Sequence, residues 1–268
     1  MDTLKLYIRL VSFSIYSQMQ YRASFILTAI AYFLAIGIEI VTLFFLFERF
    51  HSIGSWNLEE VALLYGIVNI AFSLSEALGC GFDKFSTMVK SGDFDRVLLR
   101  PRSTLLQVAG NRLDLMRFGR LIQGVFVSTW ALHALDLHLS LWALFHMSFA
   151  TLGATLLFTG VFVFQATLCF WTTESLEVVH TVSHGSLEIG RYPLFVFEKW
   201  LQGFFVFIVP LACVSYYPVL TILGHHDGNA LPLPLWAGTL TPIAGILFFL
   251  LACYFWRCGV LRYCSTGS

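Results

Sequence analysis

Long apolar stretches alternate with shorter polar ones along this sequence. A helix needs about 20 mostly apolar residues to cross the roughly 30 Å hydrocarbon core of a bilayer, and six stretches approach that length. They are residues 24–47, 61–80, 115–136, 141–170, 200–217 and 235–256. The pattern therefore predicts an all-α membrane protein, in which a single transmembrane domain forms a bundle of six helices.

The composition of the chain is typical of a membrane protein. Of its 268 residues, 57% are hydrophobic and 12% are charged, and 27 are phenylalanine. A soluble domain usually has about 25% charged residues, so this chain has too few charges to cover a globule in water. Lipid is therefore the expected solvent, and no nucleic-acid partner is expected.

Basic residues predict how the chain is threaded, because lysine and arginine collect in the cytoplasmic loops of membrane proteins. With six spans and the N-terminus inside, fifteen of the sixteen lysine and arginine residues fall on the inner side, and Arg49 falls outside. This count assigns Lys199 to an inner loop, together with the polar stretch 171–193, which includes Arg191. We therefore expect both termini to be cytoplasmic.

Two segments are predicted to enter the membrane without crossing it. Residues 1–22 carry apolar side chains at helical spacing, which predicts a helix lying in the inner interface. In residues 218–234, Pro218 and Gly224 bracket an apolar helix that is too short to span. We expect this segment to form a re-entrant loop at the outer side, and the alternative is an exposed loop.

The loop at residues 81–101, GFDKFSTMVKSGDFDRVLLRP, combines apolar and charged positions at helical spacing. It predicts one short helix that ends at Ser91-Gly92 and a second that starts near Asp93 and stops before Pro101. A structured, charged loop on the cytoplasmic side suits the docking of a soluble partner. The alternative is an ordinary basic loop that only determines topology.

Several landmarks along the chain resemble a bacterial family of type-2 ABC-transporter permeases. The first is SGDFDRVLLRP, which is similar to the family signature G-x-x-D-R-x-L-L-R-P. Others are Tyr21-Arg22-Ala23, Arg191-Tyr192-Pro193, the stretch from Ile208 to Gly224, and the ending with Trp256, Gly259, Arg262-Tyr263 and Ser265-Thr266-Gly267. Together they cover nearly the whole chain from residue 21 onward.

The resemblance implies an exporter subunit in the bacterial inner membrane, with six spans, an interfacial helix and a cytoplasmic coupling helix. Such permeases work as dimers, of identical or related chains, bound to an ABC ATPase subunit that holds ATP and Mg²⁺. The sequence has no G-x-x-x-x-G-K-[ST] motif, so no cofactor and no ATP hydrolysis are expected on this chain. The implied coupling residues are Phe82, Asp83, Phe85, Asp93, Asp95, Arg96 and Arg100. The resemblance does not separate those that hold the loop from those that touch the ATPase.

Polar groups inside spans are candidates for the transport pathway, because they are costly in lipid. Glu39 and Glu76 are the main ones, and Asn69 and Gln165 are weaker. Each could line a pathway for a polar or cationic substrate. Each could equally bond to a neighbouring helix or to a second subunit.

Two other classes of function remain as alternatives. A proton-coupled secondary transporter would use Glu39 or Glu76 as the carrier and would need no ATPase partner. A membrane-embedded enzyme would need convergent catalytic groups, and no such constellation is evident. No metal site is expected either: the six cysteines form no C-x-x-C pair, and His225, His226 and Asp227 lack suitable ligand spacing.

Overall fold

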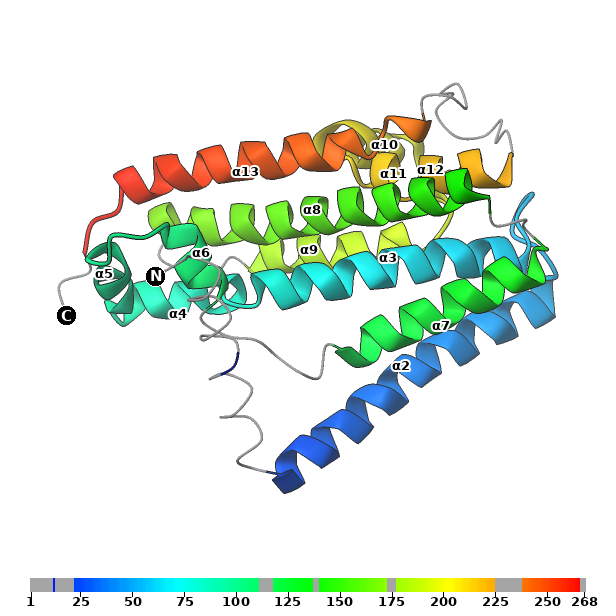
Figure 1. Cartoon of the computed structure of the whole chain (residues 1–268), viewed down its shortest axis with the longest axis horizontal. Coiled ribbons are helices and arrows are strands. Elements are labelled where there is room, and N and C mark those ends of the chain that lie inside the picture. Colours follow the sequence, from blue (N-terminus) through cyan, green and yellow to red (C-terminus); the bar gives the residue numbers. More distant parts are fainter. Residues whose placement is uncertain are drawn as a thin grey trace.

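The computed structural model describes residues 12, 22–110, 118–136, 140–172, 177–224 and 238–265. The expected interfacial helix at residues 1–22 lies outside this part of the chain, apart from Ser12 and Arg22. Residues 225–234 of the expected re-entrant loop lie outside it as well. The described residues form helices and include no β-strand, and the long helices run side by side (Figure 1).

The longest helices of the described residues are α2 (Arg22–Phe50), α3 (Leu58–Gly79), α7 (Phe118–Ala134), α8 (Leu141–Thr172) and α13 (Ile243–Leu261). Of these, α3, α8 and α13 are long and apolar enough to cross a bilayer, and a bent pair of helices after α9 could add a fourth span. The chain is therefore an all-α membrane protein. The number of six spans stays a prediction.

Glycines bring the long helices into close contact. Gly66 of α3 lies against Gly124 and Ser128 of α7, so a Cβ atom at Gly66 would overlap the Ser128 side chain. Gly153 of α8 lies in the same way against Gly245 of α13. In lipid no hydrophobic force drives helices together, and small residues allow the backbones to approach until dispersion contacts form. These contacts join α3 to α7 and α8 to α13.

The two ends of the bundle differ in structure (Figure 1). One end carries short helices that follow α3: η1 (Phe82–Lys84), α4 (Phe85–Lys90), α5 (Asp93–Leu98) and α6 (Thr104–Ala109). We call it the inner end, because the predicted cytoplasmic loop lies there. The outer end carries the connection between α2 and α3 and the start of α8.

The helix α9 (Glu177–Gly190) packs along the bundle. It runs beside α3 and α8, and Gly190 lies against Val68, near the middle of α3 (Figure 1). The prediction that residues 171–193 form an inner loop is therefore wrong for α9 and for Arg191, whose side chain is buried. The polarity of this stretch suggested contact with water, but Arg191 is paired with polar groups of the protein.

After α9 the chain reaches the outer end and then turns back toward the interior. The ring of Phe195, in η3 (Leu194–Val196), lies against Gly54 in the connection between α2 and α3. Next come α10 (Lys199–Gly203) and the π-helix η4 (Phe204–Ile208), and they lead to Leu211, which lies against Gly190. Residues 199–211 thus run from the outer end to the middle of the bundle.

The helices α11 (Leu211–Val214) and α12 (Tyr216–Leu223) lead outward again, and the ring of Tyr216 stacks on Trp56 at 5.6 Å. The two halves of this segment are bent by 69° at a break that contains Pro210, because proline interrupts helical hydrogen bonding. The break falls inside the span expected at 200–217, and the bent pair has the form of a broken span or of a re-entrant segment. The chain leads from α9 through residues 191–197 toward the outer end, and both Phe195 and Tyr216 lie there, beside Gly54 and Trp56.

Candidate functional site

The loop predicted for coupling forms two short helices at the inner end. Thr87 and Val89 of α4 accept hydrogen bonds from Ser91, and the chain then turns at Gly92, whose φ of 71° is left-handed. Glycine adopts this conformation without steric cost, which explains why the helical pattern breaks at this point. The α5 helix starts directly afterward, so α4 and α5 form two separate short rods.

Buried aromatic side chains hold this loop against the long helices. Phe82, Phe85 and Phe94 are 3%, 0% and 0% exposed. The rings of Phe85 and Phe94 are 5.1 Å apart, and Phe85 is 4.9 Å from the ring of Trp256 on α13. Two of the predicted coupling residues, Phe82 and Phe85, therefore hold the loop in place and present no surface to a partner.

The charged residues of the loop lie at its surface. Asp93, Arg96 and Arg100 are exposed, while Asp83 and Asp95 are half-buried. Arg96 is 3.3 Å from Asp93, and their side chains are 81% and 51% exposed. An exposed ion pair of this kind adds little stability, so both side chains are available to a partner.

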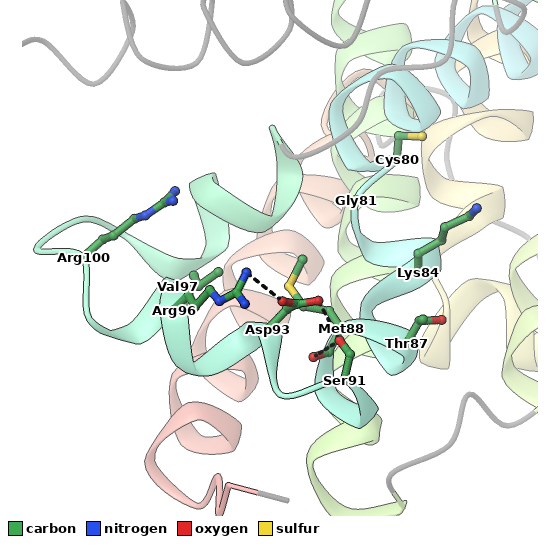
Figure 2. A pocket seen from close by; sticks show the side chains of 10 residues that line it. All are labelled: Cys80, Gly81, Lys84, Thr87, Met88, Ser91, Asp93, Arg96, Val97 and Arg100. Atoms are coloured by element: carbon green, nitrogen blue, oxygen red, sulfur yellow. Dashed lines mark hydrogen bonds and ion pairs between the residues drawn. The ribbon is translucent and has the colours of Figure 1, made fainter. Parts of the chain in front are cut away.

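An open groove of about 500 Å³ lies between α4 and α5 (Figure 2). Four charged residues line it: Lys84, Asp93, Arg96 and Arg100. Three of them are basic and one is acidic, so these residues have a net charge of about +2. The hydroxyl of Ser91 donates a hydrogen bond of 2.7 Å to Asp93 and keeps that carboxylate at the groove.

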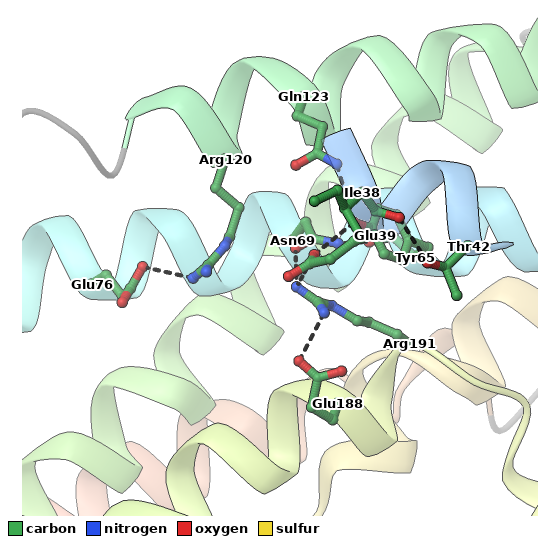
Figure 3. A network of polar contacts seen from close by, with 10 residues as sticks. All are labelled: Ile38, Glu39, Thr42, Tyr65, Asn69, Glu76, Arg120, Gln123, Glu188 and Arg191. Carbon is green, nitrogen blue, oxygen red and sulfur yellow. Dashed lines mark hydrogen bonds and ion pairs between the residues drawn. The ribbon is translucent and has the colours of Figure 1, made fainter. Parts of the chain in front are cut away.

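A second polar cluster lies in the middle of the bundle, around Arg191 (Figure 3). Its guanidinium contacts Glu39 of α2 at 3.0 Å, Asn69 of α3 at 2.9 Å and Glu188 of α9 at 2.8 Å. The Arg191 side chain is 3% exposed. The cluster thus brings together two of the predicted pathway residues, Glu39 and Asn69, through an arginine that the sequence placed elsewhere.

Tyr65 joins this cluster to α7. Its hydroxyl donates a hydrogen bond to Glu39 at 3.0 Å and accepts one from Gln123 at 3.1 Å. The Arg191 guanidinium also lies over the Tyr65 ring, 5.1 Å from its centre. Four helical elements therefore contribute to one polar network, and each charge in it has a bonded partner.

The other two predicted pathway residues lie elsewhere. Glu76, on the inner half of α3, pairs with Arg120 of α7 at 3.1 Å, and both side chains are mostly buried. Arg120 also lies over the ring of Phe72 at 5.4 Å. Gln165 is buried in the inner half of α8. Glu76 therefore connects α3 to α7 and does not belong to the Arg191 cluster.

Arg191, Tyr65, Gln123 and Glu188 are the residues that the sequence did not identify for this cluster. The sequence did contain one signal that Arg191 and Glu188 can pair at the end of a helix. Arg191 directly precedes Tyr192-Pro193, where a helix must end, and Glu188 lies three residues earlier. Hydropathy alone pointed the other way, because a polar stretch is expected to lie in water. The partners that allow burial come from α2 and α3, which are distant in sequence.

The two carboxylates of the cluster are partly open. The side chains of Glu39 and Glu188 are 34% and 60% exposed in the single chain. A charged side chain at the centre of a bilayer costs about 2.5–3.5 kcal/mol even on permissive scales. This face of the bundle is therefore suited to water or to another protein surface, and not to lipid tails.

Neither region has the features of a metal centre. Among the described residues, no group of three or more histidine, cysteine, aspartate or glutamate side chains could hold a metal ion. The pair His225-His226 and Asp227, considered from the sequence, lie outside the described residues.

The chain was also compared with known proteins. A family model described as "ABC-2 family transporter protein" matches residues 33–267. No curated protein and no solved structure matches the chain. The match includes the loop of α4 and α5, the Arg191 cluster and all of the described C-terminal residues.

Proposed function

The chain belongs to the ABC-2 transporter family, and on that premise we propose that it is the permease subunit of an ATP-driven exporter. In this proposal a separate ABC ATPase binds ATP and Mg²⁺ and docks on the loop of α4 and α5. The observation that carries the proposal is the construction of this loop. Its aromatic residues are buried against the bundle, while its charged residues surround an open groove.

The loop combines rigidity with an accessible charged surface, and both are needed for coupling. A flexible loop would absorb the movement of an ATPase, whereas Phe85 and Phe94 pack against α8 and α13 through ring contacts of about 5 Å. The basic groove favours a partner surface with acidic groups, because complementary charge speeds and orients association. The partner-facing residues in this proposal are Arg96, Arg100 and Asp93, and Phe82 and Phe85 only position them.

The transport pathway in this proposal runs along the face between α2 and α9, where a second permease subunit completes it. Two observations support this location. Glu39 and Glu188 are partly exposed in the middle of the bundle, where lipid would be unfavourable. In addition, α2 has many exposed apolar side chains, among them Ile30, Leu34 and Ile38. A partner subunit would cover this face, as either an identical or a related chain.

The mechanism follows from these positions. ATP-driven closure of the two ATPase subunits pushes on α4 and α5, and the buried rings pass the movement to the long helices. The cavity between the two permease subunits then changes from inward to outward access. The bacterial inner membrane is the proposed location, with the loop and both termini in the cytoplasm.

The docking proposal is tested by reversing one exposed charge. The chain is purified in mild detergent, and the amount of co-purified, vanadate-sensitive ATPase is measured per permease. Arg96→Glu should lower this ratio about tenfold, because like charges at an interface repel. Arg257→Glu changes another exposed arginine, near the inner end of α13; it is the control and should leave the ratio unchanged.

Two outcomes would count against the proposal. If the unaltered chain never yields a stoichiometric ATPase, the chain does not work with such a partner. If Arg96→Glu and Arg257→Glu behave alike, the ATPase does not dock on α5.

A further inference from the structure

The C-terminal landmark of the sequence has no role in the function proposed so far. In the structure α13 ends at Leu261, and residues 262–265, which we call the C-terminal strap, contact α5. The ring of Tyr263 lies 5.0 Å from Phe94 of α5 and 5.9 Å from Phe170 of α8. The hydroxyl of Ser265 donates a hydrogen bond of 2.7 Å to Asp95.

The α5 helix depends on such contacts for its stability. It has six residues, and isolated helices shorter than about 12 residues are marginal in water. Phe94 is its one fully buried residue. The rings around Phe94 belong to Phe85, Phe170, Trp256 and Tyr263, and the ring of Tyr263 is the nearest, at 5.0 Å.

The strap also holds the charged side of α5. Burial and the neighbouring Asp95 carboxylate raise the pKa of Tyr263 above its usual value. Ser265 bonds to Asp95, the residue directly before Arg96. The backbone that carries the exposed arginine is thus tied, through Asp95, to a residue 170 positions later in the chain.

The ring contacts around Phe94 indicate which long helices are connected to the loop. Phe170 belongs to α8, and Trp256 belongs to α13 and donates a hydrogen bond of 3.1 Å to Thr104 of α6. The helices α8 and α13 are in close contact along their length, with Gly160 against Phe248 and Gly153 against Gly245. The contacts of Phe94 therefore reach both α8 and α13, and these two helices are packed against each other.

We propose that the C-terminal strap positions α5 and transmits movement of the docking loop to α8 and α13. This inference rests on the proposed function, since it assigns the strap to the loop that receives the ATPase. Tyr263 and Ser265 are positioning residues: they act through Phe94 and Asp95 and need not touch the ATPase. The partner-facing residues of the loop, Arg96, Arg100 and Asp93, are exposed.

The positioning role is tested by hydrogen exchange in the purified chain without any partner. Tyr263→Ala should make amide exchange in peptides covering residues 93–98 about tenfold faster, because a ring contact and its burial are lost. Ser265→Ala removes one hydrogen bond and should give about a threefold increase. Unchanged exchange in both variants would overturn the proposal.

Tyr254→Ala is the matched control. Tyr254 lies on the same helix as Trp256 and is 64% exposed, so the same substitution removes a ring that does not face the loop. Exchange at residues 93–98 should stay at its original rate. If Tyr254→Ala accelerates it as much as Tyr263→Ala, the effect is a general loosening of α13 and the strap has no specific role.

Transmission is tested in the complex with the ATPase, trapped with ATP and orthovanadate. In the unaltered complex, trapping should change exchange in α13 at residues 243–261, and in Tyr263→Ala this change should fall at least about threefold while the ATPase stays bound. An undiminished change in α13 would overturn transmission through the strap. Failure of the proposed function has a different signature, since the unaltered chain would then bind no ATPase at all.

Discussion

The guanidinium of Arg191 shows how strongly the stability of this protein depends on ion pairs in its interior. Arg191 is buried between α2, α3 and α9 and bonded to Glu39, Asn69 and Glu188. Removing one partner of a buried ion pair leaves an uncompensated charge and typically costs about 3–5 kcal/mol. Arg191→Ala should therefore lower stability by about 3 kcal/mol, measured as a lower thermal unfolding midpoint of the purified chain in detergent.

A second substitution separates the loss of stability caused by the broken ion pair from the loss caused by poorer packing. Adding Glu39→Gln to Arg191→Ala removes one unpaired carboxylate and should recover part of the loss. Lys199→Ala, at an exposed lysine, should change stability by no more than about 0.5 kcal/mol. If Arg191→Ala unfolds at the same temperature as Lys199→Ala, the cluster does not stabilise the bundle.

At the scale of helices, the α3–α7 pair depends on a close backbone approach. A Cβ atom at Gly66 would meet the Ser128 side chain and lie 3.0 Å from the carbonyl oxygen of Gly124. Both Glu76–Arg120 and Tyr65–Gln123 require this spacing. Gly66→Val should separate the helices and destabilise the chain by about 1–3 kcal/mol, seen as a lower yield of monodisperse protein in size-exclusion chromatography.

Gly37 offers a control in the same type of element. It lies in α2, and a Cβ atom there would have no neighbour within 4 Å. Gly37→Val should therefore leave the yield unchanged. Equal losses in both variants would mean that valine is harmful in these helices for reasons other than the α3–α7 contact.

For the whole molecule, the path of the chain after α9 decides the topology. Phe195 lies at the outer end beside Gly54, and Lys199 follows four residues later and is exposed. In a chain whose six cysteines are replaced by serine, Lys199→Cys should react with a membrane-impermeant thiol reagent from outside intact cells. Arg96→Cys should react only after permeabilisation, because the loop of α4 and α5 lies at the opposite end.

Labelling of both positions from one side would contradict this topology. In particular, a cysteine at position 199 that reacts only from the inside would support the prediction from the basic residues that this position lies in an inner loop. A re-entrant segment at residues 199–223 that starts from the outer end would then be excluded.

The sequence was sufficient where local composition and spacing decide the structure. Long apolar stretches predicted an all-helical membrane protein, because each such segment must satisfy its own backbone in lipid. The break at Ser91-Gly92 and the two short helices on either side followed in the same way from helical spacing and from the left-handed turn that glycine allows. None of these features needs a distant partner.

Only the tertiary structure decided the features that join distant residues. Arg191 bonds to Asn69, 122 positions away, and Ser265 bonds to Asp95, 170 positions away. Hydropathy describes each segment as if water or lipid surrounded it, so it placed α9 and Arg191 in a loop. A polar group can be buried once its partners compensate for the lost water, and those partners are brought together only when the whole bundle packs.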